Sequence, residues 1–464
     1  MEKITTKLPK EFLERMKENL GENFDKYMLA VDETPVRGLR VNTTRISVDE
    51  YLKKYDKNLE AIEYARDGFV FNDDDKIGYS AEHLSGLVYL QEPSSMLAVC
   101  ASEIEKDDRP LKVLDLCASP GGKTGQIASR ISSDSVLFSN EIISSRAGIL
   151  HSNVERLGLK NVVVLNEKPE NLTVFENYFD YVFVDAPCSG EGMFRKNPET
   201  IEEWSKENVL MCANRQKDIL SIALGLVKAG GKLVYSTCTF AREEDEDIVE
   251  WVLNNFDFKL VDVPKAIKNS TVSMASNIEN ADFARKFYPF SGKGEGQFVA
   301  VFENIGEEKP TKLYKKKHFR AVNEIGRTWR NYVDAFLDEN TTFKITRRPF
   351  VVGNNVYLVP ENLETEVQTA LDELKFVSIG VKMGVIEKER FEPNHNFFMA
   401  YADEFKNKIE LNDTDMKKYL HGEELMISTG AKGYGVVVKD GYPLGGVKIV
   451  GGRLKNLYPK GLRV

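Results

Sequence analysis

The sequence predicts an α/β protein built around a parallel β-sheet, and three observations lead to this expectation. From about Leu111 the chain alternates short apolar runs with helix-like stretches, the pattern of parallel strands joined by crossover helices. A tight glycine turn follows the first of these runs. Two cysteines, Cys188 and Cys238, follow two later runs. Because 464 residues exceed one ordinary hydrophobic core, we expect several domains.

The segments before this sheet mix helix and strand signals. Residues Phe12–Leu20 have the spacing of an amphipathic helix, and Gly38–Asn42 resembles a short strand. The first hundred residues therefore predict an α+β extension.

Within the sheet we expect five strands, with a helix at Ser144–Leu157 between the second and the third. The strands are Lys112–Leu116, Val136–Ser139, Val162–Leu165, Tyr181–Val184 and Lys232–Tyr235. Phe298–Phe302 is expected to form a late edge strand. Lysine-rich sequence from Gly306 to Arg320 predicts a linker. Beyond it lies a second α+β region. From about Met399 its glycines and short β-type runs, Gly435–Val438 and Gly446–Val450, indicate a small barrel.

Composition excludes several classes of protein. No apolar run approaches the length that spans a bilayer, and the first residues lack the apolar stretch of a signal peptide, so we expect a cytoplasmic protein that does not enter membranes. The five cysteines are odd in number and lack CxxC spacing, and the five histidines are scattered, so no metal site is expected. A net charge of −9 argues against indiscriminate coating of nucleic acid. Local basic stretches, 309–320 and 441–464, can still bind phosphate.

The first predicted strand leads into the glycine turn Cys117–Thr124. Its GGKT has the wrong spacing for a phosphate loop, and no dinucleotide G-x-G-x-x-G is present. A glycine turn between a strand and a helix still brings backbone N–H groups close to a ligand. The next strand ends at Glu141, about 20 residues further on, where a carboxylate suits ribose hydroxyls. These features indicate a nucleoside cofactor without a pyrophosphate, and S-adenosyl-L-methionine fits.

Cys188 and Cys238 each stand at the end of a predicted buried strand. In an open parallel sheet such ends border one crevice, so the two thiols are expected to share it. A thiolate there is a candidate nucleophile, although residue chemistry alone does not rank the two. Cys100, Cys117 and Cys212 are expected to be small buried hydrophobic side chains.

Several motifs resemble those of the Nop2/Sun family of RNA cytosine-5 methyltransferases. They are Cys117–Thr124, Asp185–Gly192, Arg195–Pro198, Tyr235–Thr239 and Gly294–Phe298, and their order and spacing agree over about residues 85 to 303. Near the C-terminus, Gly452–Asn456 and Tyr458–Arg463 resemble the bacterial RsmF-type branch, which carries a PUA-like RNA-binding domain.

The resemblance implies a Rossmann-like class I S-adenosylmethionine-dependent methyltransferase core, with an N-terminal α+β extension and a C-terminal α+β/PUA-like β-barrel region. The expected domains are an N-terminal RNA-binding extension at 1–105, the methyltransferase domain at 106–305, a basic linker at 306–330, an α+β connecting domain at 331–398 and a PUA-like RNA-binding domain at 399–464.

The resemblance also implies roles for individual residues. Cys238 is the nucleophile that attacks cytosine C6, and Cys188 assists release of the methylated RNA. Asp185 contacts the cytosine edge, and Lys123 stabilises charge or orients the base. The implied cofactor-binding residues are Cys117, Ala118, Ser119, Pro120, Gly121, Gly122, Lys123, Glu141 and Asp185. Lys168 stands near the position where the family often places an acidic adenine contact, so Asn166 or Glu167 is expected to substitute.

The implied substrate is 16S ribosomal RNA, naked or within the small ribosomal subunit. The sequence leaves the oligomeric state open, and a monomer is the default expectation. For contact with RNA we expect cations and an aromatic ring of the last segment: Lys448, Arg453, Lys455, Tyr458, Lys460 and Arg463. Three alternatives stay open. The substrate could be tRNA or DNA, and DNA enzymes would use the Pro-Cys cysteine as nucleophile. The protein could also be a non-catalytic RNA-binding assembly factor.

Overall fold

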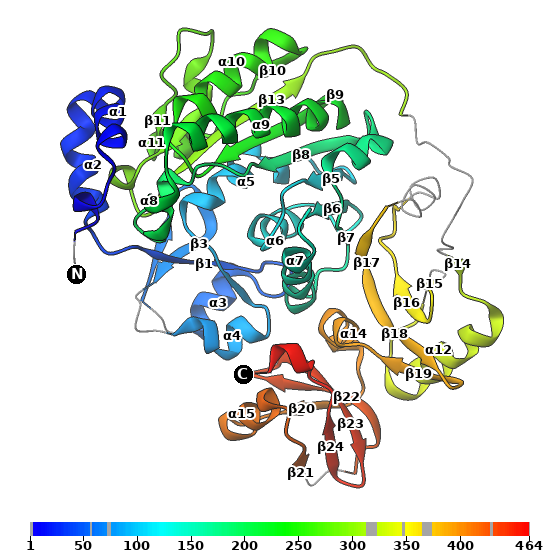
Figure 1. Ribbon diagram of the computed structural model, residues 1–464. Helices are drawn as coiled ribbons and strands as arrows, with labels where there is room; N and C mark the ends of the chain where they lie inside the picture. Colours follow the sequence, from blue (N-terminus) through cyan, green and yellow to red (C-terminus); the bar gives the residue numbers. More distant parts are fainter. Residues whose placement is uncertain are drawn as a thin grey trace.

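The computed structural model describes residues 3–55, 58–71, 76–311, 323–345, 349–363, 374–426 and 430–463. The described residues form four β-sheets, which follow one another along the sequence except that β17 (Phe376–Ile379) belongs to the second sheet (Figure 1). None of the helices in these residues combines the length and the apolar character that crossing a membrane requires.

The N-terminal sheet is antiparallel, with the strand order β2-β3-β1-β4. Its strands are β1 (Arg37–Val41), β2 (Leu59–Ile62), β3 (Ala65–Phe71) and β4 (Val88–Leu90). Its helices are α1 (Lys10–Leu20), α2 (Phe24–Val31), α3 (Val48–Lys54), α4 (Ala81–Leu84) and α5 (Leu97–Ser102). The predicted helix Phe12–Leu20 and strand Gly38–Asn42 are confirmed within two residues. Phe12 and Met16 bury the apolar face of α1, as their spacing of four requires.

The largest sheet has the order β11-β12-β13-β9-β8-β5-β6-β7-β17, with β10 beside β13. Its strands are β5 (Lys112–Asp115), β6 (Val136–Asn140), β7 (Val162–Leu165), β8 (Phe179–Asp185), β9 (Val227–Thr237), β10 (Phe258–Leu260), β11 (Val272–Ser273), β12 (Arg285–Phe287) and β13 (Gln297–Asn304). Strands β5 to β9 are parallel, which confirms all five predicted strands.

The helices of this region lie between the strands. They are α6 (Gly122–Ala128), α7 (Ser144–Leu157), α8 (Glu199–Glu203), α9 (Lys206–Leu226), α10 (Glu246–Asn255) and α11 (Lys265–Asn269). The α7 bounds equal the prediction. Apolar side chains cover both faces of the sheet, since alternate residues of a strand point to opposite sides: Leu114 belongs to one core and Val113 to the other.

The prediction that Phe298–Phe302 is an edge strand is wrong. Strand β13 pairs with β9 on one side and with β12 and β10 on the other. All five side chains from Phe298 to Phe302 are fully buried, which fits a strand inside the sheet.

One strand of this sheet comes from far along the chain. Strand β17 (Phe376–Ile379) lies antiparallel to β7 and forms the opposite edge. In Figure 1 it joins the sheet from the C-terminal half of the chain. The backbone N–H of Asn166 donates to the Lys375 carbonyl at 2.9 Å, which continues the pairing beyond the strand.

Two smaller sheets complete the chain. The first has the order β14-β15-β16-β18-β19, formed by β14 (Asn323–Glu324), β15 (Phe350–Val352), β16 (Asn355–Leu358), β18 (Val381–Glu387) and β19 (Arg390–Pro393), with α12 (Arg327–Asn340) and α14 (His395–Ala400). The second has the order β20-β22-β23-β24-β21, formed by β20 (Lys408–Glu410), β21 (Leu425–Met426), β22 (Gly433–Lys439), β23 (Tyr442–Val450) and β24 (Arg453–Asn456), with α15 (Asp413–His421).

The two predicted β runs after Met399 are confirmed as parts of β22 and β23. The lysines of the predicted basic linker, Lys315, Lys316 and Lys317, lie outside the described residues. The end of the predicted linker, by contrast, contains β14 and the start of α12. The five domain boundaries drawn from the sequence stay predictions.

Candidate active site

A cavity of about 720 Å³ opens at the carboxyl ends of the parallel strands. This is the crevice where an open α/β sheet binds ligands, because β5 stands between β6 and β8 and the strand order reverses there. Six of the residues singled out from the sequence line this cavity, and the other lining residues are a mixture of apolar, polar and charged side chains. The six are Cys117, Ser119, Glu141, Asp185, Cys188 and Cys238.

The two cysteines meet in this cavity. Strands β8 and β9 are adjacent and parallel, with Asp185 beside Ser236, so the residues that follow them emerge together. The Sγ atoms of Cys188 and Cys238 are 3.3 Å apart. The hydrogen bond to Cys238 and burial raise the pKa of the Cys188 thiol well above its ordinary value. Cys188 therefore holds its proton at neutral pH.

Glu191 joins the segments that carry the two cysteines. Its buried carboxylate accepts hydrogen bonds from Trp204 Nε1 at 2.8 Å and from the Phe240 backbone N–H at 3.2 Å, and it pairs with Arg15 of α1. The next residue, Gly192, donates its backbone N–H to the Cys238 carbonyl at 2.9 Å. A Cβ at position 192 would lie 3.0 Å from that carbonyl oxygen, so glycine permits the close approach.

The buried carboxylate of Glu244 fixes the turn that carries Cys188 through hydrogen bonds. It accepts from the Ser189 backbone N–H at 3.0 Å, from the Ser189 hydroxyl and from Gln216 Nε2 at 2.8 Å. Gln216 Nε2 also donates to the Pro187 carbonyl at 3.1 Å. Burial raises the pKa of Glu244 to about 7, despite these hydrogen bonds.

Asp185 forms an ion pair with Lys123, with 2.7 Å between Nζ and Oδ2. Its other oxygen accepts from the Ser236 hydroxyl at 2.8 Å and from Gln297 Nε2 at 3.3 Å. Burial alone would lower the pKa of Lys123, but the Asp185 carboxylate outweighs it and the net shift is upward. Lys123 stays charged, and its ammonium group holds Asp185 at the cavity wall.

The glycine turn lies beside this pair. Gly121 has a φ of 111° and directly precedes α6, which makes the turn possible without strain. Of the turn, Cys117 and Ser119 line the cavity, whereas Ala118, Pro120, Gly121, Gly122 and Lys123 are not among its lining residues. The Ala118 backbone N–H donates to the Asn140 carbonyl at 2.9 Å and ties the turn to the end of β6. Burial raises the pKa of the Cys117 thiol, so this thiol is not a competing nucleophile.

Glu141 follows β6 directly and its carboxylate is buried at the cavity. It accepts from the Ile143 backbone N–H at 2.9 Å and lies 3.5 Å from the Arg146 guanidinium. A carboxylate beside a glycine turn, in a cavity of this volume, suits the ribose of a nucleoside. The carboxylate of Asp185 on the same wall suits a positively charged sulfonium or ammonium group. The residues present thus fit S-adenosyl-L-methionine.

The structure places Asn166 and Glu167 away from the wall. Asn166 Nδ2 donates to the backbone carbonyl of Glu141 at 2.7 Å. The Glu167 carboxylate accepts from Asn171 Nδ2 and from the Lys375 backbone N–H, both at 2.5 Å. Lys168, Pro169 and Glu170 line the cavity instead. Both predicted substitutes for the adenine contact are engaged elsewhere.

The predicted RNA-binding cations lie on the last sheet and its C-terminal turn. Arg453, Lys455, Lys460 and Arg463 are exposed, and Lys448 is half-buried. Lys448 faces Lys455 across strands β23 and β24. Tyr458 differs, because its ring is buried against His395 and Tyr419, with centroids 5.6 and 5.5 Å away. That position leaves no open ring face and does not suit the stacking role predicted for Tyr458.

Sequence reasoning missed the residues that support the cysteines. Glu191 lies in the motif Asp185–Gly192, but that motif does not show that the Glu191 carboxylate is buried. Gln297 also lies in a quoted motif, Gly294–Phe298, but its contact with Asp185 could not be inferred from it. Arg15 and Gln216 carry no local signal, because their partners lie far away along the chain. Among the described residues no group of three or more His, Cys, Asp or Glu side chains could hold a metal ion.

The fold and the cavity define a class: a Rossmann-like methyltransferase with paired cysteines at its strand ends. Comparisons with known proteins give the family. Residues 101–303 match the model of the 16S rRNA methyltransferase RsmB/F family. Three further models describe RsmF domains: the N-terminal domain matches 8–93, the first C-terminal domain 335–401 and the PUA domain 406–464.

Curated relatives match over almost the whole chain. Ribosomal RNA small subunit methyltransferase F of Enterobacter sp. (strain 638) is 32% identical over 98% of this chain and 95% of its own length. The protein of the same name from Klebsiella pneumoniae is 30% identical over 100% of this chain and 98% of its own. The chain belongs to the RsmF family. It is an S-adenosyl-L-methionine-dependent ribosomal RNA methyltransferase with a PUA domain.

Solved structures agree in fold. A methyltransferase homolog from Pyrococcus horikoshii superimposes with a TM-score of 0.57 at 29% identity, covering 64% of this chain and 95% of that one. NSun6 from the same organism, solved with SFG, superimposes with a TM-score of 0.55 at 20% identity over 64% of this chain and 99% of that one, a likeness of fold alone.

Proposed function

We propose that the protein methylates carbon 5 of cytosine in 16S rRNA, with Cys238 as the covalent nucleophile. The observation that carries this proposal is the 3.3 Å approach of two thiols in the cavity that also contains Asp185 and Glu141. Cytosine C5 is a poor nucleophile until another group adds to C6. A soft thiolate suits that addition, and two easier steps replace one difficult step.

The chain's own residues then have the following roles. The Cys238 sulfur forms a bond to C6, and the ring electrons move to C5. Asp185, held by Lys123, accepts a hydrogen bond from the amino group of the base, and it accepts a second one from N3 once that nitrogen has taken up a proton, which favours this shift of charge. Bound S-adenosyl-L-methionine supplies the methyl group that C5 takes up. A water molecule takes the C5 proton, the electrons of the C5–H bond re-form the C5–C6 double bond, the C6–S bond breaks, and the Cys238 thiolate is released.

In this scheme Cys188 assists the release. Its raised pKa keeps a proton 3.3 Å from the Cys238 sulfur. A neighbouring S–H group can stabilise the departing thiolate, because a hydrogen bond to a charged group favours the charged form. The two cysteines thus take unequal roles although both line the same cavity.

The cofactor is held by the glycine turn from Cys117 to Lys123 and by Glu141, whose carboxylate binds the ribose hydroxyls. Lys168 and Glu170, which line the cavity after β7, are the candidates for contact with adenine. We further infer that the enzyme is a cytoplasmic monomer. Lys448, Arg453, Lys455, Lys460 and Arg463 contact RNA phosphates, since cations gathered on the last sheet and the turn after it form an electrostatic footprint.

Two substitutions test the assignment of the cysteines. Cys238→Ala is expected to abolish methyl transfer to a 16S rRNA fragment. Cys188→Ala is expected to accumulate a covalent protein–RNA adduct, visible as a shifted band on a denaturing gel. Cys212→Ala, a buried cysteine outside the cavity, is the matched control. An adduct in Cys238→Ala and none in Cys188→Ala would reverse the roles. Bisulfite sequencing of 16S rRNA identifies the methylated base.

A further inference from the structure

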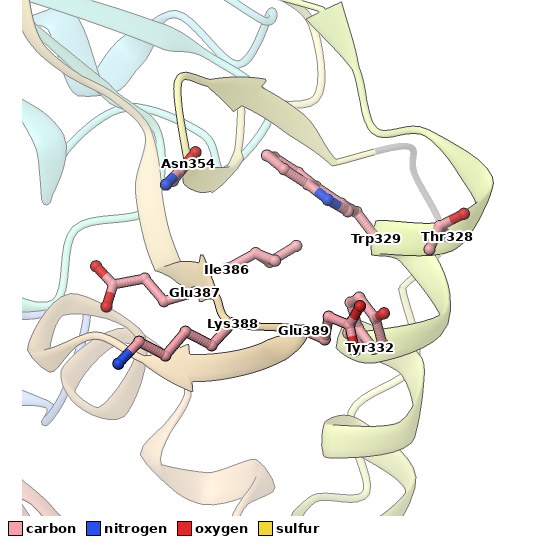
Figure 2. Close-up of a pocket in the computed structure, with 8 residues that line it drawn as sticks. All are labelled: Thr328, Trp329, Tyr332, Asn354, Ile386, Glu387, Lys388 and Glu389. Atoms are coloured by element: carbon pink, nitrogen blue, oxygen red, sulfur yellow. The ribbon is translucent and has the colours of Figure 1, made fainter.

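Strand β12, two strands away from β9 in the largest sheet, carries a buried lysine, Lys286. Lysine side chains are almost never fully buried unless they are paired. The ordinary case is Lys388, which lines the cavity between α12 and the β18–β19 hairpin in Figure 2 and is exposed. Lys286, by contrast, is only 3% exposed. A charge that has lost its water to this extent requires specific partners.

Three oxygen atoms surround the Lys286 ammonium group. Its Nζ lies 2.8 Å from Glu246 Oε2 and 3.0 Å from Asp245 Oδ2, and it donates to the Phe240 carbonyl at 3.0 Å. Burial alone would lower the pKa of Lys286, but the Asp245 and Glu246 carboxylates outweigh it and the net shift is upward. Lys286 therefore stays charged at neutral pH.

The register of the sheet explains how Lys286 is connected to strand β9. Lys286 of β12 is paired with Phe298 of β13, and Phe298 is paired with Thr237 of β9. Residues that stand opposite each other in neighbouring strands point to the same face, so these three side chains form one row. Asp245 joins the two ends of the row, because its Oδ1 accepts from the Thr237 hydroxyl at 2.6 Å while its Oδ2 pairs with Lys286.

These contacts hold the chain on both sides of Cys238. Thr237 directly precedes Cys238, and Phe240 follows it by two residues. Lys286 is linked to Thr237 through the Asp245 carboxylate, and it binds the Phe240 carbonyl directly. One buried ammonium group therefore fixes both flanks of the residue that carries the sulfur.

We propose that Lys286 is a positioning residue for Cys238, and that its ammonium group fixes the turn so that the sulfur meets C6 of the cytosine. Lys286 is not among the residues that line the cavity, so it acts through the turn and not by touching the substrate. The inference rests on the proposed function in one respect, that Cys238 is the nucleophile. A displacement of about 1 Å in a reacting group can cost about 10²-fold in rate, and the contacts of Lys286 oppose such a displacement.

The rate of covalent attack tests this role. The full chain with Cys188→Ala is expected to accumulate the Cys238–RNA adduct, so under single-turnover conditions the shifted band on a denaturing gel reports that rate. Adding Lys286→Met, which keeps the length of the side chain and removes its charge, is expected to slow adduct formation about 10²-fold. Adding Lys286→Arg, which keeps the charge, is expected to recover about tenfold of this loss. Lys388→Met, at the exposed hairpin of Figure 2, is the matched control and is expected to leave the rate unchanged.

Steady-state kinetics separate positioning from general damage to the fold. With Cys188 present, Lys286→Met is expected to lower kcat about 10²-fold and to change the KM for S-adenosyl-L-methionine less than about twofold, because Lys286 does not line the cofactor cavity. Glu246→Gln removes one carboxylate of the same cluster but leaves the contacts of Lys286 with Asp245 and Phe240 in place. Its kcat is therefore expected to fall less than about threefold.

A smaller change tests the other end of the network. Thr237→Val keeps the shape of the side chain and removes only the hydroxyl that Asp245 accepts, so the ion pair with Lys286 remains. In the Cys188→Ala chain this change is expected to slow adduct formation about tenfold, since it removes one hydrogen bond to a charged group. Thr237→Val gives the answer if Lys286→Met does not fold.

Three results would overturn the inference. They are an unchanged adduct rate in folded Lys286→Met, an unchanged adduct rate in Thr237→Val, or an equal fall in kcat in Glu246→Gln and Lys286→Met, which would show that the cluster acts only through the stability of the fold. Failure of the proposed function looks different. In that case the Cys188→Ala chain forms no adduct even with Lys286 in place, and the role of Lys286 is refuted together with that of Cys238.

Discussion

The Glu191 carboxylate accepts a hydrogen bond from the backbone N–H of Phe240, two residues beyond Cys238, at 3.2 Å. Glu191 itself lies three residues after Cys188. One buried carboxylate therefore bridges the two segments that carry Cys188 and Cys238, and Arg15 of the N-terminal extension neutralises it. The extension thus helps to position the thiols, in addition to any contact it makes with RNA.

The first prediction concerns the ion pair between Arg15 and Glu191. Arg15→Ala leaves the Glu191 charge buried without its partner, so the cysteine segments are expected to shift. We expect kcat to fall about tenfold or more, since loss of a buried charged partner costs roughly 1–3 kcal/mol. The KM for S-adenosyl-L-methionine is expected to change little, because Arg15 does not line the cofactor cavity. Steady-state kinetics measure both.

Lys10→Ala is the matched control, because Lys10 lies on the same helix and pairs with exposed Glu14 at 3.6 Å. An equal fall in kcat in Arg15→Ala and Lys10→Ala would show that α1 affects the rate only through the general stability of the fold. Arg15→Lys, which restores the charge, is expected to recover part of the rate.

The second prediction is a dependence of stability on pH. Burial raises the pKa of Glu244 from 4.5 to about 7. The folded protein then binds more protons at this site than the unfolded chain between these values, so the Glu244 contribution to stability falls as pH rises through that window. Glu244→Gln mimics the protonated form and removes this slope. We therefore expect the Tm of the variant minus the Tm of the natural protein to increase as the pH is raised from about 5 to about 8.

Thermal unfolding at the two pH values checks this expectation. Glu243→Gln is the control, because Glu243 precedes Glu244 in the same turn, whereas the hydrogen bonds from Ser189 and Gln216 go to Glu244. A constant difference in Tm between Glu244→Gln and the natural protein across the window would contradict the assigned cause.

Strands and the cysteine pair could be predicted because their signals are local. Apolar runs gave the five parallel strands, and the register of β8 and β9 then brought Cys188 and Cys238 together. Strand β17 could not be predicted, since nothing in Phe376–Ile379 specifies pairing with β7. Tyr458 has the composition of an RNA contact, but burial of its ring depends on His395 and Tyr419, which are distant in sequence.

The third prediction concerns the Asp185–Lys123 ion pair. Asp185→Asn removes the charge that the base edge and Lys123 both require, and methyl transfer is expected to fall about 10²-fold or more. Lys123→Met is expected to lower the rate as well, because it leaves Asp185 in the cavity without the 2.7 Å contact of its ammonium partner. The double variant is expected to be no slower than the slower single variant, since both act through one carboxylate. Additive losses in the logarithm of kcat/KM would show that the two side chains act independently.

The last prediction separates a structural role of Glu167 from a cofactor contact. Its carboxylate binds the Lys375 backbone N–H, which precedes β17, and Asn171 Nδ2, while Lys168 and Glu170 line the cavity. Glu167→Ala leaves both donors without an acceptor, and we expect a loss of about 1–3 kcal/mol in the free energy of unfolding. Glu167→Gln keeps an acceptor oxygen and is expected to lose less.

Calorimetric titration with S-adenosyl-L-methionine completes the comparison. In Glu167→Gln the Kd for the cofactor is expected to stay within about twofold of the natural value, whereas Glu141→Gln is expected to raise it about tenfold or more, because only the second substitution removes a charged acceptor from the cavity wall. If instead Glu167→Gln weakens cofactor binding as much as Glu141→Gln does, the carboxylate of Glu167 must turn toward adenine when the cofactor binds. Strand β17 would then lose one of its two hydrogen bonds at Lys375 in the same step, so cofactor binding would loosen the edge of the largest sheet.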